Sequence, residues 1–215
     1  MHNDVQRSAP LSMSTRVTRA AVSFVLVAIG VATLIQSGLG VAPFDVLNTG
    51  VANTLGIPVG VAFLIDAAAC YALGVVLGGK VGWASLIGTV VISPLLQLCL
   101  IVIPDPDQLA VRVPMFVVGL LVLTIAICLV ISTEMGAGPT EVVMLGMVSR
   151  GWSVHRSRWI IDGLAFVLGV ALGGAAGVGT VVIALALGPM VAFGLRRLRY
   201  SSPGALQVEA AIAGA

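Results

Sequence analysis

Charged residues are scarce in this sequence of 215 residues. Asp, Glu, Lys and Arg together make up 9% of the chain, and hydrophobic residues make up 59%. A soluble domain carries about 25% charged residues, which cover its surface. The composition therefore predicts a protein that lies in a lipid bilayer. The net charge of +2 is small, and the basic residues cluster beside apolar segments, so no nucleic acid is expected as a partner.

The sequence also lacks the motifs of common enzymes. It contains no Gly-x-Ser-x-Gly, no His-Glu-x-x-His, no phosphate-binding loop and no Cys-x-x-Cys pair. Its three cysteines, Cys70, Cys99 and Cys128, lie within apolar runs, where small core residues are the ordinary interpretation. We therefore expect no enzyme, no catalytic residue, no metal site and no cofactor.

Long apolar runs dominate what the sequence does contain. A helix needs about 20 apolar residues to cross ~30 Å of hydrocarbon. Six runs approach that length, at residues 18–36, 59–78, 83–103, 113–133, 159–175 and 178–195. Because the runs are continuous and do not alternate apolar with polar residues, they predict helices and not barrel strands. The run at 159–175 is the weakest, since it is short and contains Asp162.

The chain contains an internal repeat. Residues 35–46 (IQSGLGVAPFDV) align without a gap with residues 131–142 (ISTEMGAGPTEV), 96 positions later. The stretch GTVVI also occurs twice, at 88–92 and at 179–183. Many transporter folds consist of such repeats and bind their substrate where the copies meet.

Two short stretches decide the number of crossings. Residues 43–57 and 139–151 each open with a proline at the first helical position and are too short to cross hydrocarbon as helices. We interpret them as re-entrant or half-helices, which leaves six full crossings, three per copy. Three crossings per copy make the second copy inverted relative to the first. Eight crossings, with parallel copies, satisfy the positive-inside rule equally well; segment length favours six.

The expected organisation follows from this count. With six crossings, every Lys and Arg except Arg112 falls on one side, which is then the cytoplasm. The chain divides into a cytoplasmic N-terminal tail at 1–16, repeat A at 17–103, an external linker at 104–112, repeat B at 113–195 and a cytoplasmic C-terminal tail at 196–215. The expected location is the bacterial cytoplasmic (inner) membrane, with the lipid bilayer as surroundings and a homo-oligomer left open.

The repeated motifs are the first candidates for a binding site. Gly40, Pro43 and Asp45 in the first copy correspond to Gly136, Pro139 and Glu141 in the second. The start of each short helix presents free N–H groups and about half a positive charge, so two opposed starts are a candidate site for a small solute or ion. One alternative is structural, because each acid sits at the third helical position and compensates the helix dipole. Another places the first short helix flat in the membrane interface.

Asp66 and Asp162 are the second candidates, because each lies within an apolar span at the matching place in its copy. A lipid-facing Asp costs about 2.5–3.5 kcal/mol at the bilayer centre, so both are expected to face the bundle interior. Proton or cation coupling and a structural role beside the re-entrant backbone are left as equal alternatives. Arg158, one turn before Asp162, favours the structural role as an i, i+4 partner. The residue that matches it before Asp66 is Ala62.

The segment SGLGVAPFDVLNTG at 37–50, the later Gly-Gly pair and the GTVVI stretch resemble the bacterial YczE/YyaS/YitT-type family of integral membrane proteins. The likeness covers most of residues 17–195. It implies an inner-membrane helical protein with several spans and supplies no substrate. The absence of the large cytoplasmic C-terminal domain of some YitT-like members favours the YczE-like branch.

Together these features predict an all-α membrane protein with six transmembrane helices and two half-helices in a 3+3 inverted repeat. The expected function is a transporter or exporter of a small solute or ion through a central site at the repeat interface. The competing hypothesis is a non-transporting membrane scaffold or accessory subunit of another complex. A polar cavity that joins the two proline motifs favours transport, whereas a solid apolar interior favours the scaffold.

Overall fold

The computed structural model describes residues 12–136 and 138–197, and within these residues every regular element is a helix. The helices are α1 (Met13–Ser37), α2 (Pro43–Leu55), α3 (Val59–Val76), α4 (Trp83–Val102), α5 (Leu109–Thr133), α6 (Pro139–Ser149), α7 (Val154–Ala171) and α8 (Val178–Arg197). All the predicted helices are confirmed, although several ends differ by a few residues. The expected tails lie mostly outside the described residues.

Local signals in the sequence explain where several helices begin and end. The side chains of Ser12 and Ser153 cap the starts of α1 and α7 by accepting a backbone N–H. Pro43 and Pro139 are the first residues of α2 and α6, where the missing N–H of proline costs nothing. Gly38 ends α1 in the left-handed conformation, which glycine adopts without strain.

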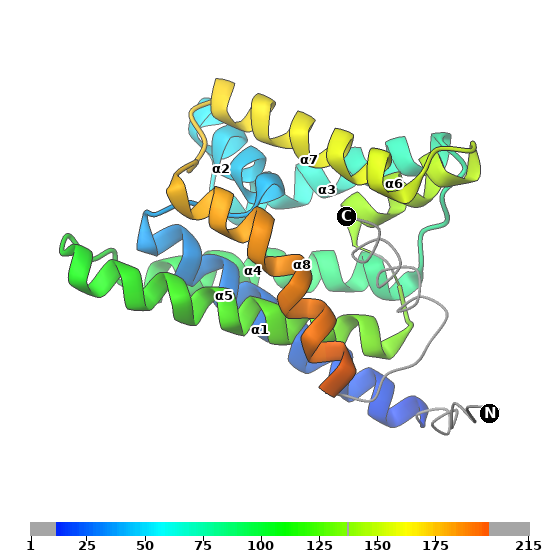
Figure 1. Ribbon diagram of the computed structural model, residues 1–215, viewed down its shortest axis with the longest axis horizontal. Helices are drawn as coiled ribbons and strands as arrows, with labels where there is room; N and C mark the ends of the chain where they lie inside the picture. Colours follow the sequence, from blue (N-terminus) through cyan, green and yellow to red (C-terminus); the bar gives the residue numbers. More distant parts are fainter. Residues whose placement is uncertain (1–11, 137, 198–215) are drawn as a thin grey trace, which may run out of the picture.

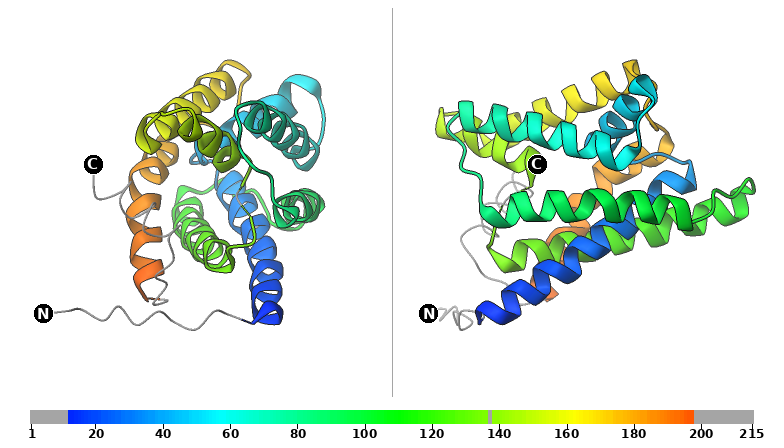
Figure 2. Two further views of the ribbon diagram at one scale, coloured as in Figure 1. Left: turned by 90° about the vertical axis from the view of Figure 1, so that its right-hand side faces the viewer. Right: turned by 180° about the vertical axis from the view of Figure 1, so that it is seen from behind.

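The helices form two layers (Figures 1 and 2). In the first layer α1 and α5 pack against each other at the centre, with α4 beside α1 and α8 beside α5. The second layer contains α3 and α7 with the two short helices. There α2 packs against α3 and α7, and α6 packs against the same two helices. The second layer meets the first where α3 packs on α4.

Two arginines show that α1 and α5 run antiparallel. Arg16, near the start of α1, forms an ion pair of 2.9 Å with Glu134 at the end of α5. Arg112, near the start of α5, donates to the backbone carbonyls of Ser37 and Gly38 at the end of α1, at 2.6 and 2.7 Å. The start of each helix therefore lies at the end of the other. These contacts also define two ends of the molecule, the Arg16 end and the Arg112 end.

The six long helices alternate in direction between these ends (Figure 1). Helices α1, α4 and α7 run from the Arg16 end to the Arg112 end, and α3, α5 and α8 run back. The direction of α4 agrees with its contacts, because the Gln36 side chain at the end of α1 donates to the carbonyls of Leu100 and Ile103 at the end of α4. Matching helices of the two copies therefore run in opposite directions.

Five helices are long and apolar enough to cross a membrane, namely α1, α3, α4, α5 and α8 among the described residues. The helix α7 is as long as α3 but carries Arg156, Arg158 and Asp162. Large apolar side chains cover the outside of the bundle, including Trp83, Ile101 and Val178. These features indicate an integral, multi-pass membrane protein surrounded by lipid.

The main core lies between α1, α4, α5 and α8. Leu34 and Leu96 are almost completely buried there, together with Phe116 and Ile183. The backbones of α1 and α5 approach closely, because a Cβ on Gly30 would lie 2.9 Å from the Leu123 nitrogen. Small residues at such crossings are the usual means of packing membrane helices.

Candidate functional site

Each short helix packs against the long helix of the other copy. A Cβ added to Gly169 of α7 would lie 2.5 Å from backbone atoms of Val46 and Leu47 in α2. A Cβ added to Gly74 of α3 would lie 2.7 Å from the Val142 side chain in α6. Gly74 and Gly169 match in the repeat, as do Val46 and Val142. The same contact is therefore made twice, with the copies exchanged.

The far ends of the short helices repeat this exchange. Asn53 and Thr54 of α2 donate side-chain hydrogen bonds to the carbonyls of Gly173 and Leu172, which follow α7. In the other copy, Ser149 and Arg150 at the end of α6 donate to the carbonyls of Leu77 and Val76 at the end of α3. Both pairs satisfy carbonyls that a helix end leaves without an intrahelical partner. These bonds were not predicted from the sequence, although the repeat already matches Asn53 with Ser149 and Thr54 with Arg150.

The glycine-rich leads before α2 and α6 also contact the opposite copy. A Cβ on Gly40 would lie 2.7 Å from the Thr180 nitrogen at the start of α8, and the adjacent Leu39 carbonyl accepts from Gly179. A Cβ on Gly136 would collide with the Ser85 side chain at the start of α4. Residue 137, within the second lead, lies outside the described residues. Both leads need glycine because of close approach, and Gly40 also has a φ of 122°.

The chain contains two matching Gly-x-x-x-Gly motifs, from Gly74 to Gly78 and from Gly169 to Gly173, and the glycines within each have different roles. Gly74 and Gly169 are packing positions. Gly78 and Gly173 lie beyond the helix ends with φ values of 89° and 75°. They allow the chain to leave α3 and α7.

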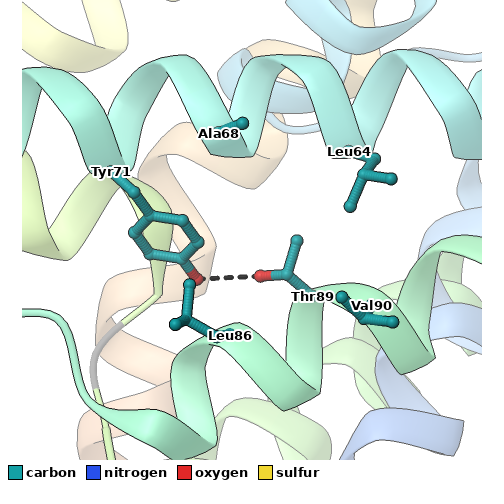
Figure 3. Close-up of a pocket in the computed structure, with 6 residues that line it drawn as sticks. All are labelled: Leu64, Ala68, Tyr71, Leu86, Thr89 and Val90. Carbon is teal, nitrogen blue, oxygen red and sulfur yellow. Dashed lines mark hydrogen bonds between the residues drawn. The ribbon is translucent and has the colours of Figure 1, made fainter.

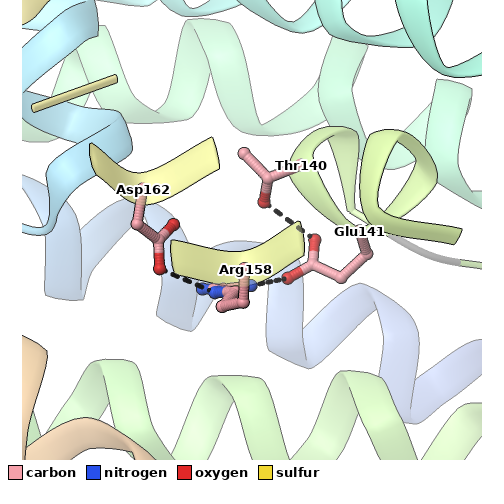
Figure 4. A network of polar contacts seen from close by, with 4 residues as sticks. All are labelled: Thr140, Glu141, Arg158 and Asp162. Carbon is pink, nitrogen blue, oxygen red and sulfur yellow. Dashed lines mark hydrogen bonds and ion pairs between the residues drawn. The ribbon is translucent and has the colours of Figure 1, made fainter. Parts of the chain in front are cut away.

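The second copy holds a charged network (Figure 4). The Arg158 guanidinium donates to Oδ2 of Asp162 at 2.8 Å and to Oε1 of Glu141 at 3.0 Å. The Thr140 hydroxyl lies 3.3 Å from the other oxygen of Glu141. One arginine thus joins an acid from the α6 motif to Asp162 of α7. The i, i+4 pairing of Arg158 with Asp162 is confirmed.

The first copy has the matching acids without the arginine. Oδ1 of Asp45 accepts from the Asn48 amide at 3.2 Å. Oδ2 of Asp66 is buried and has no hydrogen-bond partner among the described residues. Ala62 occupies the place of Arg158 and is fully buried. The two copies therefore match in backbone and differ in charge.

The acids of the short helices lie in the first turn, as predicted. The residues before them, Ala42 and Gly138, make no side-chain cap hydrogen bond. Asp45 bonds to Asn48, and Glu141 bonds to Arg158. From the first turn both acids can compensate the helix dipole, as the structural alternative requires. The interfacial alternative for α2 is disfavoured, because the Phe44 ring packs on Phe63 of α3, with centroids 6.2 Å apart.

The structure brings some of the predicted site residues together and keeps others apart. It joins Glu141 to Asp162 through Arg158. Asp66 and Glu141 both lie within electrostatic range of the Cys70 thiol in the second layer. The helices α2 and α6 lie toward opposite ends of that layer (Figure 1), and no ion pair or hydrogen bond between described residues joins Asp45 to Glu141.

A pocket of about 270 Å³ lies between α3 and α4 (Figure 3). Its lining is almost entirely apolar, with the Tyr71 and Thr89 hydroxyls bonded to each other at 2.8 Å. The remaining lining residues are Leu64, Ala68, Leu86 and Val90. None of them belongs to the predicted site, so this pocket differs from a polar cavity joining the two proline motifs.

Comparison with known proteins places this architecture in a family. The sequence profile of DUF6198, a family of unknown function, matches residues 14–196. The chain belongs to this family. A similar protein is an uncharacterized protein of Haemophilus influenzae, 28% identical over 169 residues, or 78% of each chain. No solved structure matches.

Proposed function

We propose that the protein transports a small solute or ion through a site at the interface between its two repeats. The proposal includes six crossings, formed by α1, α3, α4, α5, α7 and α8, and two half-helices, α2 and α6. Within its family, the chain is assigned by this proposal to the YczE-like branch, on the strength of the segment at 37–50.

Helix lengths support six crossings. The 13 residues of α2 and the 11 residues of α6 give lengths of about 20 and 17 Å, well short of ~30 Å of hydrocarbon. The 18 residues of α7 give about 27 Å, the same as α3. Three charged residues lower the mean hydropathy of α7. Two of them, Arg158 and Asp162, neutralise each other as an ion pair.

Helix directions support an inverted repeat. Matching helices run antiparallel, and the arginine contacts at the two ends of α1 and α5 are exchanged between the copies. A twofold axis perpendicular to these helices lies in the membrane plane if the helices cross it, which is the symmetry of many secondary transporters.

The distribution of charge supports a cytoplasmic location for both termini. Lys80 and Arg150 lie in connections at the Arg16 end, while the connection from α4 to α5 at the Arg112 end contains Asp105 and Asp107. Positive residues accumulate on the cytoplasmic side of bacterial membrane proteins. The Arg16 end is therefore assigned to the cytoplasm of the inner membrane.

The observation that most supports a transport function is the unequal exposure of the two matched acid sites. In the second copy, Arg158 is exposed and Glu141 and Asp162 are partly exposed. In the first copy, Asp45 and Asp66 are buried. Exposed charges are costly in hydrocarbon, so the second site faces water or headgroups while the first is closed. One open and one closed copy of the same site is the asymmetry expected of an alternating-access transporter in one state.

Labelling of Cys70 tests this function, because its thiol lies within electrostatic range of both Asp66 and Glu141. In a variant with Cys99→Ala and Cys128→Ala, we expect a membrane-impermeant methanethiosulfonate reagent to modify Cys70 in both preparations. In spheroplasts the reagent reaches the external face of the membrane, and in inverted vesicles it reaches the cytoplasmic face. The matched control keeps Cys128 alone, which is buried against α8 and is expected to stay unmodified. A Cys70 that is protected on both faces contradicts alternating access.

A membrane scaffold is the second candidate function. The apolar pocket between α3 and α4 supports it, because Leu64, Leu86 and Val90 are exposed at its rim and offer a surface to a partner helix. Protection of Cys70 on both faces, together with co-purification of a membrane partner that Val90→Trp abolishes, favours the scaffold over transport.

A further inference from the structure

The pocket between α3 and α4 is a groove that runs along both helices (Figure 3). On α3 its lining residues are Leu64, Ala68 and Tyr71, whose spacing places them on one face of the helix. The seven positions from Leu64 to Tyr71 give the groove a length of about 10 Å. Since the connection at 77–82 follows α3 and leads into α4, the Tyr71 end of the groove is the end nearer to that connection.

The groove faces the hydrocarbon of the membrane, and its hydroxyl groups are already paired. Both of its helices are long and apolar enough to cross a membrane, and Leu64 and Leu86 are exposed at its rim. The Tyr71 hydroxyl donates to the Ser85 carbonyl at 3.1 Å and lies 2.8 Å from the Thr89 hydroxyl. An occupant therefore gains free energy by burying apolar surface, as a hydrocarbon chain does.

The size of the groove suits one acyl chain. Its volume of about 270 Å³ lies just below the ~300–1,000 Å³ of pockets that enclose a whole drug-sized ligand. A helix is about 10–12 Å across with its side chains, so it cannot enter the groove and can only lie over the rim. A single extended hydrocarbon chain is narrow enough to enter, and the surrounding bilayer supplies such chains.

Two cations lie beyond the end of the groove that is nearer to the connection. Lys80 is exposed in the connection at 77–82, which contains no acidic residue, and it has no hydrogen bond or ion pair with a described residue. Arg150 is also exposed, and its guanidinium donates to the Val76 carbonyl at the end of α3, at 2.8 Å. Both positive charges therefore lie at the same end of α3, which is the Arg16 end of the molecule.

Trp83 marks the depth at which the headgroups begin. It is the first residue of α4, is 83% exposed and lies one turn before Leu86, a lining residue of the groove. Exposed tryptophan is enriched at the level of the headgroups. The groove therefore begins about one helical turn below this level, where the acyl chains start.

The second copy shows that the fold does not require these cations. Ala175 occupies the place of Lys80, and Thr54 occupies the place of Arg150. Thr54 donates to the Leu172 carbonyl that follows α7, so an uncharged side chain is sufficient to pair a carbonyl at this helix end. The charges of Lys80 and Arg150 are therefore available to a partner of opposite charge.

We propose that this groove binds one acyl chain of an anionic phospholipid, whose phosphate lies at Lys80 and Arg150. Basic sites between membrane helices on the cytoplasmic side bind anionic headgroups in this way. The Arg16 end is the one assigned above to the cytoplasm. This inference goes beyond the transport function and does not depend on it, because it needs only helices that cross the membrane.

Quenching of Trp83 fluorescence tests the headgroup specificity. Trp152→Phe and Trp159→Phe leave Trp83 as the single reporter, in vesicles of phosphatidylcholine mixed with dibrominated phosphatidylglycerol or dibrominated phosphatidylcholine. We expect phosphatidylglycerol to bind beside Trp83 with a higher relative constant than phosphatidylcholine. Lys80→Ala and Arg150→Thr, which copy the second repeat, are each expected to lower this preference by about fivefold at low ionic strength.

Arg197→Ala is the matched control for the loss of a positive charge. Arg197 is exposed at the end of α8, which lies beside α5 and away from the groove. Its replacement is expected to leave the preference unchanged. Equal quenching by the two lipids, or a preference that survives the loss of both Lys80 and Arg150, overturns the proposal.

Native mass spectrometry of the purified protein tests the acyl chain. We expect one phosphatidylglycerol molecule to stay bound to the wild type and to be lost from Ala68→Phe, which fills the groove from α3. Ala69→Phe is the control, since Ala69 is exposed on the same helix and does not line the groove. Val90→Phe fills the groove from α4 and takes the place of Ala68→Phe if that variant does not fold. Retention of the lipid by a folded, groove-filling variant contradicts the proposal.

The same spectra separate the lipid from other occupants. Glycerol 3-phosphate carries a phosphate without acyl chains and is not expected to displace the lipid. Displacement would mean a site for the anion alone and would overturn the proposal. A membrane protein that co-purifies in place of the lipid, and that Ala68→Phe releases, would mean that a partner helix covers the groove and would also overturn it.

Discussion

Replacement of Gly169 by leucine is expected to disrupt the packing of α2 on α7. A side chain at Gly169 meets the backbone of Val46 and Leu47, which cannot move aside as a flexible side chain can. Overpacking costs about 1–3 kcal/mol and occasionally more, a large share of a typical stability of about 5–15 kcal/mol. The measurement is the melting temperature and the monodisperse fraction by fluorescence-detected size-exclusion chromatography.

The chain offers a matched control in the same helix. Gly163 has open space around its Cα, so Gly163→Leu is expected to fold normally and melt close to the wild type. The repeat supplies a second test, because Gly74→Leu forces the same collision with Val142 in α6 and should be equally damaging. A Gly169→Leu protein that melts like Gly163→Leu would show that α2 does not pack on α7 as described.

Removal of the Arg158 guanidinium is the second change with a large expected effect. Arg158→Ala leaves Glu141 and Asp162 as two unpaired negative charges within the membrane protein. Breaking a buried pair costs about 3–5 kcal/mol and an exposed pair about 1 kcal/mol or less, so these partly exposed groups should lose about 1–3 kcal/mol. The melting temperature in the absence of added small cations measures this loss.

The charge origin of this loss has its own control. Neutralisation of both acids in the triple variant Arg158→Ala, Glu141→Gln and Asp162→Asn should restore most of the stability, because no unpaired charge remains. Arg156→Ala removes an exposed arginine of the same helix that has no side-chain partner among the described residues, and it should melt like the wild type. If the triple variant is no more stable than Arg158→Ala, the guanidinium acts through packing and not through charge.

The helices of this protein were predictable because apolar length and proline position decide them locally. Pro43 and Pro139 fix the starts of the short helices, and the six long runs need only be long enough to span lipid. The helix α7 was predicted to begin at residue 159 and begins at Val154. Its first turn is charged and capped by Ser153, so hydropathy alone could not include it.

The contacts between the copies were not predictable from one copy of the motif. Sequence matching pairs Gly74 with Gly169, but it does not say whether each glycine packs on its own short helix or on the other one. The three-dimensional structure shows that each long helix packs against the short helix of the other copy, α7 against α2 and α3 against α6. The different surroundings of Asp66 and Asp162 were easier to predict, because the sequence already shows Ala62 where the other copy has Arg158.

The inverted arrangement of the copies is tested most directly by the sidedness of two matching connections. Pro58 precedes α3 and Trp152 lies just before α7, and both are exposed. Single-cysteine variants Pro58→Cys and Trp152→Cys, with Cys70, Cys99 and Cys128 replaced by alanine, are labelled in intact spheroplasts with an impermeant maleimide. Six crossings predict that Pro58→Cys is labelled from outside and that Trp152→Cys is labelled only after the membrane is opened. Labelling of both positions from the same side would mean eight crossings with parallel copies and would contradict the account.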